Sequence, residues 1–360
     1  MRPASRGATM NRVKAGLIFI CCVCALAQGW GRREARQPWL TGRFAEAEQE
    51  FAQRQKIDPR PHLFLWEADY EIERARYGRA AALIKDAKKY GTSDSDGLPE
   101  KRQARLLLAV GQFLEAQKEA LAGRKWDGKD VTKLRVSSVI DLVTLGEIAL
   151  ARGDFAKAIP ILEKARNGSK NVSALFGDEW IRANDDIAVA DIGLGSTGAA
   201  ILVSALALSA AEREWGADSI PATDSRDALG LAQISQGDFK NAEMSLNLSR
   251  SRREALYGDN PKTAESYIHA ALLCSAQDQL GNAVRLLERG LEIQKAIAAG
   301  PNGRWALALL AGAEIYTKAG RKAEATDCYA SAIPVLEREL GPDAPRLEIA
   351  RKHYNELRGM

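Results

Sequence analysis

The sequence predicts an all-α fold in which antiparallel helix pairs repeat along the chain as a solenoid. First, alanines at one phase recur at steps of 42, 42, 41 and 42 residues: Ala158, Ala200, Ala242, Ala283 and Ala325. Second, the phrase Gly-Asp-Phe-x-x-Ala occurs twice in that register, at 153–158 and 237–242. Third, the chain is 46% hydrophobic but only 6% aromatic, and no segment alternates apolar and polar residues convincingly. A fixed period in this range indicates a repeat array, and the missing alternation favours helices over strands.

Each repeat contains two helices around a tight turn. The first helix ends at a small residue that accepts a left-handed conformation; these residues are Gly153, Gly195, Gly237 and Gly320. A large apolar residue follows in two units, Phe155 and Phe239, and the phase-marking alanine then lets two helix backbones approach closely. Because one unit cannot bury its apolar face alone, neighbouring units must stack.

The joints between units contain a glycine, a short polar stretch and a proline that suits the first turn of the next helix. They are 215–221, 257–261, Gly300-Pro301 and Gly341-Pro342. With these joints, the pattern resembles the tetratricopeptide repeat, and the long step is similar to the kinesin-light-chain type over about residues 135–358. The resemblance implies a right-handed superhelix whose first helices line a concave face that receives an extended peptide or a partner helix.

Residues 1–27 have the form of a signal peptide. A basic start with Arg2, Arg6, Arg12 and Lys14 precedes an apolar run, 15–27, that ends in Ala-Leu-Ala. We expect export to the periplasm or outside the cell after cleavage near Ala27. The alternative is a membrane anchor formed by residues 15–27, which would bring membrane contact. Removing four basic residues from 51 leaves 47 against 47 acidic residues, so we expect no nucleic-acid partner.

The remaining chain divides into three parts. Residues 28–124 read as irregular units of the same kind, with phase alanines Ala47, Ala80 and Ala116 at steps of 33 and 36. Residues 123–130 form a break that could act as a hinge. Residues 135–342 hold the regular repeats, and residues 343–360 are expected to form a polar capping helix, which closes a solenoid.

Several features suggest chemistry but have simpler interpretations. The string Gly193-Leu194-Gly195-Ser196-Thr197-Gly198 resembles a dinucleotide-binding turn, yet it falls at the phase of a helix–turn–helix joint and lacks a βαβ context. Cys274 and Cys328 read as small core residues, although an oxidising compartment would allow a disulfide. The histidines show no metal spacing. We therefore expect no cofactor, no metal and no enzymatic activity.

The concave face is the expected binding site. Carrying the groove positions of the resembled family onto this sequence gives Lys101, Arg102, Arg105, Glu147, Asp185, Asp186, Asp224, Asp227, Glu265, His269 and Glu314. The basic residues come early and the acidic ones in the middle. We expect Asp185, Asp186, Asp224 and Asp227 to form one solvated strip that attracts a basic segment of a protein or peptide.

The function that these observations favour is an exported scaffold or adaptor that binds a protein or peptide without catalysis. No small-molecule substrate is expected. One alternative is a structural subunit of a cell-envelope assembly, which would use the edges and the convex face. A less favoured alternative is a nucleotide-dependent enzyme that uses the 193–198 glycine turn.

Overall fold

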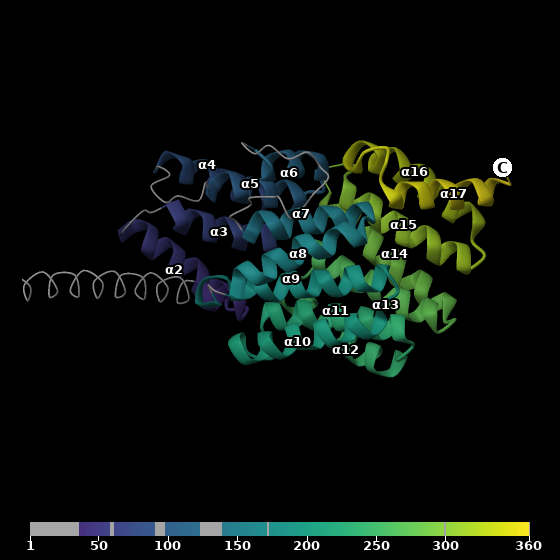
Figure 1. The fold of residues 1–360 in the computed structure, drawn as a ribbon, viewed down its shortest axis with the longest axis horizontal. Coiled ribbons are helices and arrows are strands. Elements are labelled where there is room, and N and C mark those ends of the chain that lie inside the picture. Colours follow the sequence, from purple (N-terminus) through teal and green to yellow (C-terminus); the bar gives the residue numbers. More distant parts are fainter. Residues whose placement is uncertain are drawn as a thin grey trace, which may run out of the picture.

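A computed structural model describes residues 36–57, 61–90, 98–122, 139–170, 173–298 and 300–359. Helices joined by short turns make up these ranges, and none of their residues lies in a β-strand. The expected all-α solenoid of helix pairs is therefore confirmed (Figure 1). The expected signal peptide at 1–27 and the expected break at 123–130 lie outside the described residues.

The helices alternate along the chain between an inner and an outer position. The first helices of the units are α3 (Pro61–Glu73), α5 (Leu98–Ala109), α7 (Val139–Arg152), α9 (Ser173–Gly193), α11 (Ile220–Gln236), α13 (Pro261–Ala276) and α15 (Gly303–Lys318). The second helices are α2 (Phe44–Ile57), α4 (Tyr77–Lys89), α6 (Phe113–Ala120), α8 (Phe155–Lys170), α10 (Thr197–Trp215), α12 (Phe239–Tyr257), α14 (Leu280–Ile297) and α16 (Lys322–Leu340). The last helix, α17 (Pro345–Arg358), packs on α16.

A left-handed residue ends each first helix and sets the period. Positive φ angles occur at Gly42, Ala75, Gly111, Gly153, Gly195, Gly237, Asp278 and Gly320. Ala75 and Asp278 adopt this conformation without being glycine, at φ of 56° and 59°. Five residues after each turn comes a phase alanine, and all of these alanines, from Ala47 to Ala325, have no solvent-exposed surface. The small side chain is needed because the helices of each pair cross there.

Glycines inside the helices mark the closest crossings. A Cβ atom on Gly230 would lie 2.7 Å from the side chain of Leu246, which packs against the α11 backbone. A Cβ atom on Gly193 would lie 2.5 Å from the Phe155 ring. Gly193 therefore ends α9 against the preceding unit, and Gly195 turns the chain into α10 with φ of 74°. The 193–198 glycine string is a helix–turn–helix joint, as its phase predicts.

Successive turns of the superhelix touch. Asn260, before α13, donates from Nδ2 to the Glu73 carbonyl at the end of α3 (3.1 Å). Arg304 at the start of α15 donates from Nε to the Leu108 carbonyl near the end of α5 (3.1 Å). Arg346 at the start of α17 donates from Nε to the Ala151 carbonyl near the end of α7 (2.8 Å). The start of each later helix thus packs against the C-terminal end of a helix from the preceding turn of the superhelix. Figure 1 shows the same relationship farther along the chain, where α16 and α17 lie beside α6 and α7.

The two cysteines of the described chain are free: Cys328 is buried and Cys274 is half-buried. Cys328 therefore agrees with its interpretation as a small core residue. Within the described ranges, no helix is both long and apolar enough to cross a membrane.

Candidate functional site

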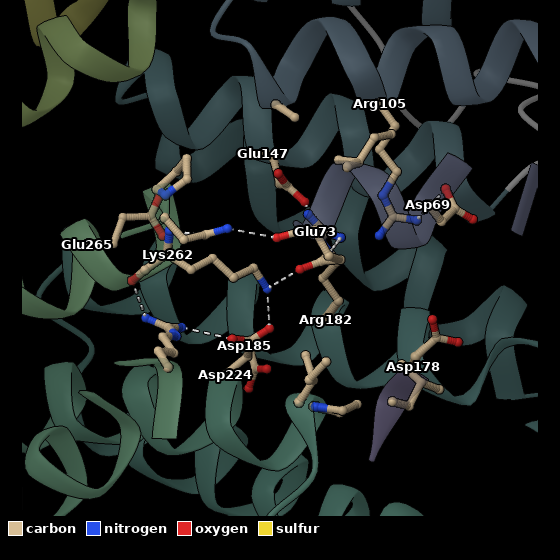
Figure 2. A pocket seen from close by; sticks show the side chains of 18 of the residues that line it. Asp69, Glu73, Arg105, Glu147, Asp178, Arg182, Asp185, Asp224, Lys262 and Glu265 are labelled. Carbon is tan, nitrogen blue, oxygen red and sulfur yellow. Dashed lines mark hydrogen bonds and ion pairs between the residues drawn. The ribbon is translucent and has the colours of Figure 1, made fainter. Parts of the chain in front are cut away.

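A cavity of about 310 Å³ lies inside the superhelix. Every first helix from α3 to α15 contributes side chains to its wall, so the inner face of the solenoid is also its binding-site candidate (Figure 2). Eight carboxylates line it: Asp69, Glu73, Glu147, Asp178, Asp185, Asp186, Asp224 and Glu265. Five cationic side chains face them: Arg105, Arg182, Arg253, Lys262 and Arg304. The wall therefore carries more acidic than basic groups.

Lys262 lies at the point where two turns meet. Its Nζ is 2.8 Å from Glu73 Oε2 and 2.5 Å from Asp224 Oδ2 (Figure 2). Burial lowers the pKa of Lys262, but Asp224 and Glu73 outweigh burial and raise it. Arg253 adds a second contact to Asp224 at 2.9 Å. Although burial raises the pKa of Asp224, Lys262 and Arg253 hold it below its usual value, so this carboxylate is ionised and neutralised within the protein.

Asp227 is buried behind the cavity wall. Its side chain is 5% exposed and contacts Arg253 (3.2 Å) and His269 Nδ1 (2.7 Å), while Ser249 Oγ donates to it (3.0 Å). Burial alone would raise the pKa of Asp227, but Arg253 and His269 lower it. Asp227 and His269 are therefore not the solvated groove residues that the sequence predicts: they tie α11 to α12 and α13.

The early basic residues are also paired inside the protein. Arg102 is buried and contacts Asp69 at 3.0 Å, and Arg105 contacts Glu179 at 2.7 Å. Lys101 is buried as well, at 7% exposure, and does not line the cavity. Of the three, only Arg105 reaches the cavity wall.

Two further predicted acids are paired on the wall. Glu147 Oε1 accepts a hydrogen bond from Arg182 Nε at 2.6 Å, and Glu265 contacts Arg304 at 3.1 Å. Glu314 lies elsewhere, in a separate hollow of about 110 Å³ with Arg346 and His353. Burial raises the pKa of Glu314.

Asp185 and Asp186 on α9 differ from the other acids. Asp185 Oδ2 accepts a hydrogen bond from Ser225 (2.8 Å), while Asp185 Oδ1 and Asp186 Oδ2 have no hydrogen-bond partner among the described residues. Burial, followed by the charge of Glu147, raises the pKa of Asp186 well above its usual value. Burial raises the pKa of Asp185 too, although Ser225 partly opposes it. The acid excess of the cavity is therefore concentrated at this pair.

The groove positions thus divide into two groups. Six of the eleven predicted residues line the central cavity: Arg105, Glu147, Asp185, Asp186, Asp224 and Glu265. The sequence prediction missed Arg182, which pairs with Glu147, and Arg253 and Lys262, which pair with Asp224. It also missed Glu73, the second acid that Lys262 contacts. The repeat phase gives no signal for Arg253, which lies on a second helix. The only hint for Lys262 is that it follows the joint proline Pro261.

Known proteins show the same architecture. Residues 220–296 match the family model of the tetratricopeptide repeat. The chain contains tetratricopeptide repeats. A search of the curated proteins finds no match.

Two solved structures share the fold of this tetratricopeptide repeat chain. A Rap protein complexed with Competence and Sporulation Factor is 12% identical, with a TM-score of 0.53 over 91% of this chain and 98% of that one. The APC/C hetero-tetramer Cut9–Hcn1 is 14% identical, with a TM-score of 0.54 over 88% of this chain and 54% of that one. BtubC (BKLC) from P. vanneervenii is 16% identical, with a TM-score of 0.41 over 78% and 92% of the two chains.

Proposed function

We propose that this chain is an exported, non-catalytic binding protein that holds a protein or peptide segment inside its superhelix. The observation that carries the proposal is the central cavity, whose wall combines side chains from every first helix from α3 to α15. The tetratricopeptide repeat fold supports this proposal, because proteins of such families are typically scaffolds that bind other proteins and carry out no catalysis. The Rap protein of similar fold is complexed with Competence and Sporulation Factor, which supports the same class of partner.

The electrostatics of the cavity favour a basic residue in the bound segment. Asp185 and Asp186 are held in a desolvated position with raised pKa values, so the free protein disfavours their ionised forms. A guanidinium or ammonium group placed against either carboxylate would supply the missing charge and hydrogen-bond donors. We thus move the proposed basic contact from Asp224 and Asp227, which Arg253 already neutralises, to Asp185 and Asp186.

Peptide binding tests this assignment. We suggest a library of fluorescent peptides in which arginine is scanned through otherwise neutral sequences, measured by anisotropy against the purified chain. A hit should weaken about tenfold or more in Asp186→Asn, since hydrogen bonds to charged groups contribute about 1.5–3 kcal/mol. The matched control is Glu243→Gln, an exposed acid on an outer helix. If the peptides bind both variants equally, the ligand does not use the cavity pair.

Export is a separate part of the proposal and rests on residues 1–27. We propose cleavage near Ala27, which gives a periplasmic or secreted chain that begins near Gln28. An intact mass of the exported protein decides this point. A mass that still includes residues 1–27 would instead support the anchored alternative.

The absence of cofactor chemistry is proposed for a structural reason. The 193–198 glycines serve the α9–α10 joint, and a Cβ at Gly193 would meet Phe155, so packing alone explains that glycine. We expect titration calorimetry to detect no heat of NAD or ATP binding. Micromolar dinucleotide binding that is lost in Gly195→Val would favour the nucleotide-dependent enzyme.

A further inference from the structure

Six of the eight carboxylates in the cavity wall contact a cationic side chain, whereas Asp185 and Asp186 contact none among the described residues. The six contacts are Asp69 with Arg102, Glu73 with Lys262, Glu147 with Arg182, Asp178 with Arg36, Asp224 with Lys262 and Arg253, and Glu265 with Arg304. The remaining cation of the wall, Arg105, contacts Glu179. Every cationic side chain of the wall is therefore already paired, and the cavity lacks two positive charges.

The two unpaired carboxylates face different sides of α9. Consecutive Cα atoms are about 3.8 Å apart, and consecutive side chains on a helix diverge by about 100°. Asp185 accepts a hydrogen bond from Ser225 of α11 at 2.8 Å. Burial, and then the charge of Glu147 on α7, raises the pKa of Asp186, which places that side chain toward α7. Figure 2 shows Glu147 well apart from Asp185, so we expect one cation to satisfy only one of the two acids.

Apolar side chains form part of the wall between the charged groups. Ile181 lies one helical turn before Asp185 on α9, Ile220 begins α11, and both are buried wall residues, as is Ile72 of α3. The methylene stems of cationic groups pack on such apolar surface while their charged heads reach polar partners. The cavity volume of about 310 Å³ is at the lower end of the range for small-ligand sites, about 300–1,000 Å³. A short alkyl chain with a positive charge at each end therefore suits the cavity.

Given the proposed function of the cavity as the binding site, we propose that it binds a linear dication: two ammonium groups joined by an alkyl chain of the length found in lysine, with one group on Asp185 and the other on Asp186. A nearby cation favours the ionised form of a buried carboxylate, so each ammonium group stabilises the charge of the acid that it contacts. This chemistry has two sources. One is a lysine at the free N-terminus of a protein, which carries an α-ammonium and a side-chain ammonium. The other is the free diamine cadaverine, which has the same two groups on the same chain.

A divalent metal ion fits the pair less well. A calcium ion takes about 6–8 oxygen ligands. Within the described ranges, no three side chains of His, Cys, Asp or Glu converge in a group that could hold a metal ion. Calcium binding is therefore an outcome that the test must distinguish.

Titration calorimetry of the purified chain with cadaverine tests the proposal. We expect saturable binding. Pentylamine, which has the same alkyl chain but one ammonium group, should bind about tenfold or more weakly, because it loses one charge-assisted hydrogen bond. Ethylenediamine should also bind more weakly than cadaverine, because its two nitrogens are too close together for carboxylates that diverge.

Two variants locate the charges. Asp185→Asn and Asp186→Asn each remove one negative charge and keep the size of the side chain, so cadaverine should then bind no better than pentylamine. A structural role alone would not remove this difference between the two amines. The matched control is Asp191→Asn, because Asp191 is also a buried acid of α9 whose pKa burial raises, but it lies outside the cavity wall. Circular dichroism verifies that each variant is folded.

A pair of peptides distinguishes the two sources. The tripeptide Lys-Ala-Ala-amide carries both charges on its first residue, and acetylation of its α-amino group leaves one. If the free peptide binds and the acetylated peptide binds about tenfold or more weakly, the source is a protein N-terminus. If cadaverine binds but neither peptide does, the ligand is a free diamine: the dication proposal then stands, while the proposed binding of a protein segment fails.

Three results overturn the proposal. Equal binding of pentylamine and cadaverine to the parent chain would show that one charge is sufficient, and would leave the proposed function intact. The absence of saturable cadaverine binding, with or without calcium binding that Asp186→Asn removes, would exclude the diamine. Equal loss of cadaverine binding in Asp191→Asn and Asp186→Asn would show that the effect does not come from the acids of the cavity wall.

Discussion

Lys262 Nζ lies 2.8 Å from Glu73 Oε2, and this ion pair joins two successive turns of the superhelix. The two side chains are 23% and 12% exposed, so water screens the pair only partly. The same ammonium group also neutralises Asp224 at 2.5 Å. Lys262 therefore has two roles: it links two turns of the solenoid, and it neutralises an acidic side chain of the cavity wall.

Replacing Lys262 by methionine should destabilise the protein. Glu73 and Asp224 would lose their shared cation, and breaking a buried pair costs about 3–5 kcal/mol, which the partial exposure reduces to about 1–3 kcal/mol. Urea unfolding measures the loss. Lys352→Met is the control, because that lysine is exposed on α17 and should change the free energy of unfolding by less than about 0.5 kcal/mol. Equal stability of the two variants would show that the turn-to-turn pair contributes nothing.

His269 should make stability depend on pH. Burial lowers its pKa, but Asp227, 2.7 Å from Nδ1, outweighs burial and raises the pKa above 6.5. The folded protein thus holds this proton more tightly than the unfolded chain does. The stabilisation is complete below about pH 6.5 and is lost as the pH rises through the folded-state pKa. Urea unfolding between pH 6 and pH 9 should show this fall in the free energy of unfolding.

The variant His269→Gln isolates this contribution. It keeps a hydrogen-bond donor for Asp227 but cannot titrate, so the free energy of unfolding should fall less steeply with pH than in the parent protein. An unchanged slope would assign the pH dependence to other groups.

The period of the sequence was sufficient to predict the fold and its phase. Glycine and alanine positions such as Gly237 and Ala242 are local requirements: one residue must accept positive φ and the other must fit a helix crossing. Each repeat shows the same requirement, so the signal accumulates along the chain. Asp278 takes the place of a glycine, but the alanine phase still identifies its turn.

The charge state of the site could not be predicted in the same way. Periodicity places Asp224 on the inner face, but it does not say how many repeats complete one turn of the superhelix. That number decides which residue faces Lys262, and the answer, Glu73, lies in the first described units. Arg253 reaches the inner face from a second helix, outside the groove positions of the repeat. The solvated strip expected at Asp224 and Asp227 is therefore an internal ion-pair network.

Ala242 tests the alanine phase directly. It has no exposed surface where α12 crosses α11, so Ala242→Leu should force the helices apart and destabilise the chain by about 1–3 kcal/mol. Ala255→Leu on the same helix is the matched control, because Ala255 is exposed and leucine fits a helix surface. Thermal melting followed by circular dichroism compares them. Identical melting of both variants would contradict the assignment of Ala242 to the crossing.

Asp186 provides the test that separates binding from folding. Burial and the charge of Glu147 raise its pKa well above the usual value, so the folded state binds a proton at Asp186 more tightly than the unfolded chain does. The protonated Asp186 carboxyl therefore adds to the free energy of unfolding at acidic pH, and this contribution is lost as the pH rises through the folded-state pKa. At neutral pH the Asp186→Asn variant should therefore unfold at higher urea, while it loses affinity for an arginine-containing peptide. A group retained at a cost to folding is typical of a binding site.

The matched comparison is Asp227→Asn, one repeat further along the chain. Its carboxylate is paired with Arg253 and His269 and has a lowered pKa, so the same substitution there should destabilise the protein. Breaking such a buried pair costs about 3–5 kcal/mol. If the free energy of unfolding rises in Asp186→Asn and falls in Asp227→Asn, the carboxylate of Asp186 lacks a cationic partner in the free protein, whereas that of Asp227 has one. If Asp186→Asn instead lowers the urea midpoint, Asp186 stabilises the fold, and the basic contact of the bound segment must be sought elsewhere in the cavity.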